Sequence, residues 1–333
     1  MLKKLILATI VVAIVLAIGG WWAHGRMNRP HRGFAAAEVF VDLPAGTGVA
    51  GIADRLAAAG VVPDAWTFRL AARIAGADRR LKAGEYRFAD AATTFDVIRR
   101  LERGDVFRRS LTIPEGLTIA EMAPIVERGG FDDARSFERA AADGTKISAF
   151  DPDARTLEGY LFPDTYMFPR TADGEAIVDA MAAGFGRAFD AGLRAEATAM
   201  RMSVREAVTL ASLIEKETAE PSERAIVSGV YHNRLRKGML LQCDPTVVYA
   251  LMKAGKWKGN IQRVHLQIDS PYNTYKYPGL PPGPIASPGR ASLEAAVRPA
   301  AVPYLYFVSR NDGTHVFAET LAEHARNVAK WQK

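Results

Sequence analysis

The sequence predicts a mixed α+β protein with three parts: a transmembrane helix, a small strand-helix-helix-strand domain and a larger mixed α/β domain. An uncharged apolar run near the N-terminus predicts the first part. An alternating strand pattern, two helical stretches and a second strand predict the second part. Helical patterns separated by loops rich in Pro and Gly predict the third. We place these parts at residues 5–22, 38–110 and 111–333.

The composition is that of a folded chain with a sizeable core. Of 333 residues, 49% are hydrophobic, which suits roughly two domains. The net charge is +6, but the basic residues are dispersed in pairs, so nucleic acid is not an expected partner. The single cysteine, Cys243, excludes an intrachain disulfide and a Cys-rich metal site, and we expect it to be a buried apolar residue.

Residues 5–22 carry no charge and are just long enough to cross a hydrocarbon core of roughly 30 Å. Trp21 and Trp22 stand at the far end, where indole rings favour the lipid headgroups. The alternative is a cleaved signal peptide, because Lys3 and Lys4 form a basic start. We favour an uncleaved anchor, since the apolar run is long and no Ala-x-Ala site follows it.

The segments beside the anchor are a tail at residues 1–4 and a basic linker at residues 23–37 that contains Gly and Pro. Lysines precede the anchor and arginines follow it, so the flanking charges do not decide the membrane topology.

The small domain starts with a half-buried strand and has helices that stop at Gly60 and Gly76, as glycine C-caps would end them. The predicted elements are a strand at 38–41, helices at 49–59 and 65–75, a turn into a strand at 81–88, a helix at 94–102 and a strand at 107–113. Later helical patterns begin at Ile119, Phe137 and Glu175, and residues 157–166 interrupt them.

A helix predicted at residues 204–218 places two acidic residues at the edges of an apolar face. The helical wheel puts Glu215 at one edge and Glu217 at the other. A carboxyl group half-buried against apolar surface has a raised pKa, which suits a general acid. The alternative is an ion-paired boundary residue, and the wheel does not choose between them. The apolar arc comprises Ala207, Val208, Leu210, Ala211, Leu213 and Ile214, and the opposite polar face comprises Arg205, Thr209, Ser212 and Lys216.

Several sequence blocks in the second half of the chain resemble the YceG-like family of endolytic murein transglycosylases. They are LASLIEKET (210–218), ER (223–224), VYHNRL (230–235), LQCDPTV (241–247), SPYNTY (270–275), GLPPGPIASPG (279–289), AAVPYLYFV (300–308) and HVF (315–317). The resemblance spans the anchor through the C-terminus, and it implies that the domain at 38–110 is LysM-like and that 111–333 is the catalytic domain.

The resemblance also implies a mechanism with one carboxyl group, Glu215, as the catalytic acid and base. A glycosidase with a single carboxyl is possible if the muramic acid C6 hydroxyl is the nucleophile, because no water then has to be activated. The product would be a 1,6-anhydromuramic end on a nascent glycan strand, and the cut would terminate strand elongation.

Polar residues in the Pro- and Gly-rich loops are the candidates for substrate binding. Each could instead form a turn, as Asp244-Pro245 and Asn273 commonly do. The candidates are Gln242, Asp244, Thr246, Asn273 and Tyr275.

No cofactor or metal is expected, because His232, His265, His315 and His324 show no metal-ligand spacing. The resemblance implies that the chain is a lyase with its bulk outside the cytoplasmic (inner) membrane. The expected partners are peptidoglycan glycan strands, membrane lipid and peptidoglycan synthases. The non-enzymatic alternative is a wall-binding scaffold that holds glycan through the LysM-like module.

Overall fold

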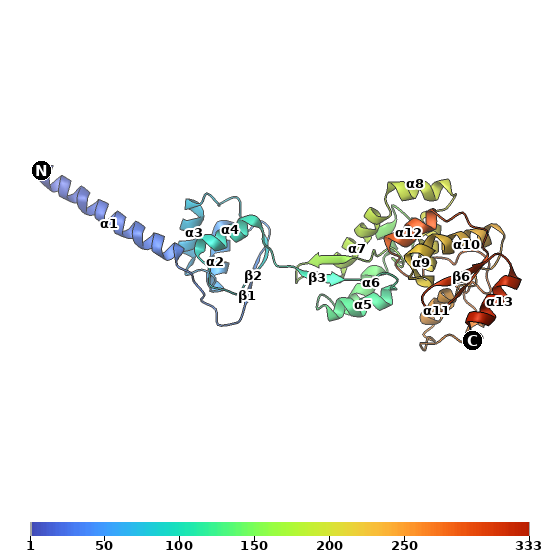
Figure 1. Ribbon diagram of the computed structural model, residues 1–333. Coiled ribbons are helices and arrows are strands. Elements are labelled where there is room, and N and C mark those ends of the chain that lie inside the picture. Colours follow the sequence, from blue (N-terminus) through green and yellow to red (C-terminus); the bar gives the residue numbers. More distant parts are fainter. Residues whose placement is uncertain (1, 333) are drawn as a thin grey trace. The chain divides into compact units, whose positions relative to one another are not determined.

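The computed structural model describes residues 2–332 and shows a mixed α/β fold, as predicted. The chain divides between Arg109 and Ser110 into two compact units, here called unit 1 and unit 2 (Figure 1). Each unit contains its own cluster of buried hydrophobic side chains. The strands of the described residues form three separate two-stranded sheets, so helices supply most of both cores.

The N-terminal helix α1 (Leu2–Asn28) continues well past Trp22, where the predicted anchor ends. Its segment Thr9–Asn28 is long and apolar enough to cross a membrane by length and composition. The expectation of a linker beginning at residue 23 is therefore wrong for residues 23–28. Ala23 and Met27 are buried in the core of unit 1, and Arg26 forms a 2.7 Å ion pair with Asp64. Because these side chains pack against the unit, the helix continues rather than giving way to a loop.

The rest of unit 1 follows the predicted order of strand, helix, helix and strand. Strands β1 and β2 pair antiparallel, with Val39 opposite Phe88 and Leu43 opposite Gly84. Helix α4 begins with a capping box in which Thr93 and Asp96 bond each other's backbone N–H. The elements are β1 (Val39–Leu43), α2 (Val49–Ala58), α3 (Ala65–Ile74), β2 (Gly84–Phe88) and α4 (Thr94–Arg103).

Unit 2 packs its helices with two small sheets, one made by β3 and β4 and the other by β5 and β6. The sheet elements are β3 (Arg109–Thr112), β4 (Thr165–Phe168), β5 (Tyr306–Ser309) and β6 (His315–Ala318). The helices are α5 (Ile119–Arg128), α6 (Ala134–Ala141), α7 (Gly174–Ala188), α8 (Ala191–Ala199), α9 (Val204–Glu217), α10 (Arg224–Arg236), α11 (Asp244–Lys253), α12 (Arg290–Val297) and α13 (Leu321–Trp331).

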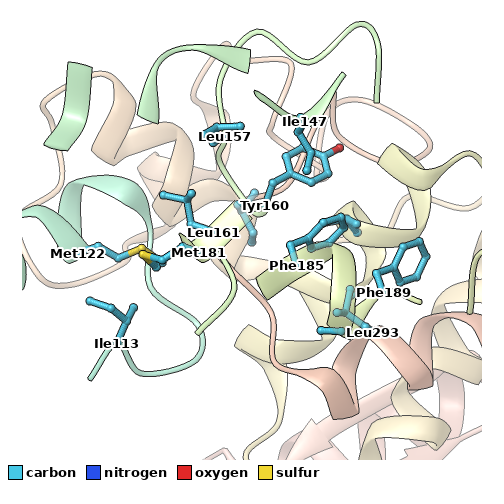
Figure 2. Close-up of a cluster of buried hydrophobic side chains, with 14 of the residues drawn as sticks. Ile113, Met122, Ile147, Leu157, Tyr160, Leu161, Met181, Phe185, Phe189 and Leu293 are labelled. Atoms are coloured by element: carbon cyan, nitrogen blue, oxygen red, sulfur yellow. The ribbon is translucent and has the colours of Figure 1, made fainter. Parts of the chain in front are cut away.

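The core of unit 2 is centred on aromatic side chains of α7 and the loop before β4 (Figure 2). The ring of Tyr160 meets Phe185 edge-on at 5.2 Å, and Phe185 stacks on Phe189 at 5.7 Å. Leu293 of α12 belongs to the same cluster. Such aromatic pairs add to the stabilisation that burial alone provides, so the frame around α9 is rigidly packed.

Helix α9 is buried on nearly all sides, which corrects one prediction. The six residues of its predicted apolar arc are buried, but Thr209 and Ser212 of the predicted polar face are buried as well. The Ser212 hydroxyl donates to the Thr209 carbonyl at 2.7 Å and accepts the backbone N–H of Ile285 at 3.1 Å. A small hydroxyl that finds partners can be buried at little cost, which accounts for the inward position of Ser212.

Candidate functional site

The C-terminal end of α9 carries the two acidic residues that the sequence singled out. Glu215 and Glu217 are both partly exposed. Their side chains leave the helix in directions that differ by about 160°, so they meet different parts of unit 2. The helix ends at Glu217, and Thr218 leaves it in an extended conformation.

Glu217 faces a group of buried and polar side chains from α10 and the start of α11. The Tyr231 hydroxyl donates to Glu217 Oε1 at 3.0 Å, and the Cys243 thiol is a second neighbour. Burial raises the pKa of the Glu217 carboxyl, and it also holds the pKa of Tyr231 well above its usual value. The carboxyl of Glu217 is thus poorly solvated and is held by side chains of the protein.

Further polar groups surround Glu217. Tyr275 donates its hydroxyl to Asp244 Oδ1 at 2.5 Å. Burial raises the pKa of Tyr275, the bond to Asp244 adds to that shift, and the nearby charge of Glu217 contributes as well. On another side, His315 Nδ1 lies 2.6 Å from Glu223 Oε2. Tyr231 and Cys243, which come from separate segments, meet at the Glu217 carboxyl.

Glu215 lies in a different setting beside the start of α12. Its Oε2 accepts the backbone N–H of Gly289 at 3.1 Å. A second carboxyl, that of Glu115, packs closely against the same glycine. A Cβ added to Gly289 would lie only 1.9 Å from Glu115 Oε1. Burial raises the pKa of Glu115, and the neighbouring charge of Glu215 raises it further. Glu115 and Glu215 therefore form an acidic pair beside Gly289.

The predicted substrate residues separate into an exposed and a buried group. Gln242 and Asp244 have exposed side chains, and Tyr275 is partly exposed. Gln242 also adopts a positive φ of 51°, and its N–H bonds the Thr274 carbonyl at 3.1 Å, which turns the chain into α11. These three side chains can reach a ligand.

Thr246 and Asn273 are fully buried and bonded within the protein. Thr246 donates its hydroxyl to the Cys243 carbonyl at 2.7 Å. Asn273 donates to the carbonyls of Leu266 at 2.9 Å and Ile268 at 2.8 Å. Both side chains hold the loops that carry Asp244 and Tyr275. This agrees with the alternative in which such residues form turns rather than contact the substrate.

The histidines and the lone cysteine have partners of their own. His232 bonds the Ala296 carbonyl at 2.9 Å, and burial lowers the pKa of His232. Cys243 is buried, and burial raises the pKa of its thiol, which disfavours the reactive thiolate. Among residues 2–332, no group of three or more His, Cys, Asp or Glu is placed to hold a metal ion.

Sequence reasoning did not single out Glu115, Tyr231 or Glu223. Glu115 occurs in a Pro-Glu-Gly turn after β3, which carries no catalytic signal by itself. Tyr231 and Glu223 lie within the quoted blocks, but only the folded chain brings them beside Glu217 and His315.

Comparison with known proteins gives a consistent result. The model of the YceG-like family matches residues 41–330. A Bacillus subtilis protein named endolytic murein transglycosylase is 35% identical over 334 residues, covering 95% of this chain and 91% of the relative. A Streptococcus pneumoniae protein of the same name is 31% identical, covering 98% of this chain and 65% of the relative. A crystal structure of a yceG-like protein from Listeria monocytogenes has a TM-score of 0.59 at 32% identity, covering 87% of this chain and 98% of that one.

Proposed function

Because this chain belongs to the YceG-like family, we propose that it is an endolytic murein transglycosylase, a lyase that cleaves peptidoglycan glycan strands. The observation that carries the proposal is the end of α9, where the partly exposed side chain of Glu215 is held by the backbone N–H of Gly289. A site of this kind can hold a sugar and transfer a proton to it.

The reaction follows from one carboxyl group acting twice. In its protonated form it donates a proton to the oxygen between N-acetylmuramic acid and N-acetylglucosamine, and the C1–O bond breaks. The C6 hydroxyl of the same muramic acid then attacks C1, and the carboxylate takes the hydroxyl proton. A 1,6-anhydro ring forms, no water is consumed, and the carboxyl returns to its starting state. A tethered nucleophile of this kind can supply several kcal/mol through its orientation.

The family resemblance assigns this role to Glu215, whose side chain is partly exposed and whose Oε2 accepts the Gly289 N–H. Glu217 is held within the protein, because burial raises the pKa of its carboxyl and the Tyr231 hydroxyl donates to it. Asp244 and Tyr275 are charged or polar neighbours that a bound sugar can reach, and Gln242 is exposed on the same loop. Thr246 and Asn273 contribute by holding that loop.

Glu217 is the alternative acid, because burial raises the pKa of its carboxyl. Glu215, by contrast, accepts the Gly289 N–H and lies beside Glu115. Two carboxylates at opposite edges of one helix end cannot easily face the same glycosidic oxygen. One of them is therefore the acid, and the other is structural.

A pair of variants decides between them. We expect Glu215→Gln to lose about 10² to 10⁴-fold in turnover or more, because proton transfer is removed while the shape is kept. Glu217→Gln should be much milder. The measurement is release of 1,6-anhydromuramic ends from purified glycan strands, with thermal unfolding of each variant as the control. The reverse pattern in two stably folded variants transfers the role to Glu217, and full activity in both rejects the mechanism.

We further propose that α1 anchors the chain in the cytoplasmic (inner) membrane, with units 1 and 2 outside the cytoplasm, where glycan strands occur. The arrangement of β1, α2, α3 and β2 supports a LysM-like module that holds glycan. Cleavage of nascent strands would terminate their elongation beside peptidoglycan synthases. Protease added to spheroplasts should degrade both units, and protection of unit 2 would reverse the topology. A chain that binds glycan but releases no anhydro ends would instead be a scaffold.

A further inference from the structure

We infer that a second cavity in unit 2, here called the Glu158 pocket, binds an N-acetylated hexosamine of the glycan strand. The cavity has a volume of about 530 Å³ and is lined by α5, α6, α11 and the loop before β4. The carboxyls of Glu215 and Glu217 do not line it. The choice of ligand rests on the proposed function, whereas the pocket itself rests on the contacts that follow.

Glu158 is the polar centre of this pocket. Its Oε1 accepts the backbone N–H of Ile119 at 3.1 Å, in the first turn of α5, and its Oε2 accepts the Tyr249 hydroxyl at 3.2 Å. Burial raises the pKa of the Glu158 carboxyl to about 7. The side chain still reaches the pocket surface, and each carboxyl oxygen has a second lone pair. A fixed acceptor is thus held in the pocket for a ligand N–H or O–H.

Aromatic rings and one cation complete the pocket. Tyr249 packs against Tyr272 with ring centroids 4.9 Å apart, and the Lys253 ammonium lies 5.6 Å from the first ring and 5.7 Å from the second. Contact with two ring faces restrains this lysine at the rim. The partly exposed indole of Trp257 also lines the cavity.

An N-acetylated hexosamine fits this set of groups. Its amide N–H can donate to Glu158, and its hydroxyls can accept from Lys253. The acetyl methyl suits the apolar wall made by Ile119, Ala141 and Met252. The apolar face of the sugar ring can lie on the indole of Trp257, since aromatic rings supply large contact areas in ligand sites. Few polar groups in a mostly apolar cavity are typical of a site that selects one orientation.

Helix α11 connects the pocket to the candidate catalytic residues. Asp244, a neighbour of Glu217, begins the helix, and Lys253 ends it. The 10 residues of the helix rise about 15 Å. A polymer that occupies both ends of α11 would thus be held at some distance from the bond that is cut, which suits an enzyme that cuts within strands.

The test measures binding of an N-acetylglucosamine tetramer to the full-length chain in detergent by calorimetry. Every protein carries Glu215→Gln, so that turnover does not interfere. We expect Trp257→Ala and Lys253→Gln each to weaken binding about tenfold, which corresponds to roughly 1.4 kcal/mol. Trp331→Ala is the matched control, because this indole is also partly exposed in unit 2 but lies on α13. It should bind as its parent does.

A second readout uses chains with Glu215 intact. Trp257→Ala should raise KM for long glycan strands about tenfold and leave kcat unchanged, because the pocket holds the strand rather than the reacting bond. Unchanged affinity for the tetramer in both pocket variants overturns the inference. So does a parent chain that binds the tripeptide of the peptidoglycan peptide stem but does not bind the tetramer. Loss of kcat in a stably folded Glu158→Gln would make Glu158 catalytic and also overturn it.

The results also separate this inference from the proposed function. If the chain binds the tetramer in the Glu158 pocket but releases no anhydro ends, the inference about the pocket stands and the transglycosylase proposal is rejected. If turnover is normal and the Trp257→Ala variant binds and cleaves like its parent, the proposed activity stands and the inference about the pocket is rejected.

Discussion

Glu215 and Glu217 are two positions apart in the chain, yet their carboxyl groups have different neighbours. Glu217 meets Tyr231 and Cys243, whereas Glu215 meets the Gly289 N–H and Glu115. The difference follows from helical geometry, which sends the two side chains to opposite sides of α9. A single-residue assignment in the Glu-Lys-Glu segment therefore depends on what packs against each side of the helix.

Glu158 allows a pH prediction at the residue scale. Its pKa is about 7 in the folded chain and 4.5 without the fold, because burial disfavours the charged form. Below pH 4.5 the Glu158 carboxyl is neutral in both the folded and the unfolded chain, so the free energy of its burial does not depend on pH. As pH rises from 4.5 through 7 the unfolded chain ionises first, and the free energy of unfolding decreases. Over this window the wild-type chain should lose about 3 kcal/mol relative to Glu158→Gln.

The measurement is urea unfolding of both chains across that pH range. Above pH 7 the difference between them should be constant. A difference that does not change between pH 4.5 and 7 would show that the carboxyl is solvated in the folded chain.

At the scale of single elements, α9 is a helix whose polar residues are as important for its packing as its apolar ones. Its N-terminus is closed by a capping box between Ser203 and Glu206. On its inward polar face, the Ser212 hydroxyl satisfies the backbone N–H of Ile285, within the loop that leads to Gly289. The Thr209 hydroxyl is also buried but has no hydrogen-bond partner.

These two hydroxyls predict opposite effects of mutation. Ser212→Ala should destabilise the chain by about 1–3 kcal/mol, because it leaves the buried Ile285 N–H without an acceptor. Thr209→Val, which has the same shape, should be neutral or slightly stabilising, because it removes an unpaired polar group. Chemical denaturation of the two variants and the parent provides the test. Equal losses in both would mean that side-chain volume alone governs this face.

At the scale of the whole molecule, the proposed membrane anchor and unit 1 are parts of one continuous structure. Helix α1 ends inside the core of unit 1, where Met27 is 3% exposed. The Arg26 guanidinium also bonds Asp64, the N-cap of α3. Unit 1 is thus fixed to the end of the candidate membrane span by packing and by an ion pair.

Two truncated chains test this continuity. A chain that starts at Ala23 should leave the membrane fraction and keep unit 1 folded. A chain that starts at Arg29 lacks Ala23, Arg26 and Met27, and unit 1 should lose several kcal/mol, since deleting one buried methionine side chain typically costs about 2–5 kcal/mol. Limited proteolysis and thermal unfolding of unit 1 compare the two. Equal resistance in both would show that residues 23–28 are dispensable for folding.

The sequence by itself determined the elements and the class of the fold. Apolar periodicity, capping residues and glycine stops are local signals, and they predicted α2, α3, α4 and α9 to within a residue or two. The uncharged run near the N-terminus predicted a membrane-spanning helix, and the motif blocks predicted the family that the comparisons found.

Only the tertiary structure decided where residues 23–28 belong, which polar residues are buried, and which carboxyls share a site. Ser212 and Thr209 have the sequence signal of a solvated face, but contacts from segments more than seventy residues away along the chain bury that face. The surroundings of Glu115, Glu158 and Glu217 are likewise assembled from distant segments. Desolvation depends on everything that surrounds a group in space, so the pKa of these carboxyls is a property of the fold rather than of the local sequence.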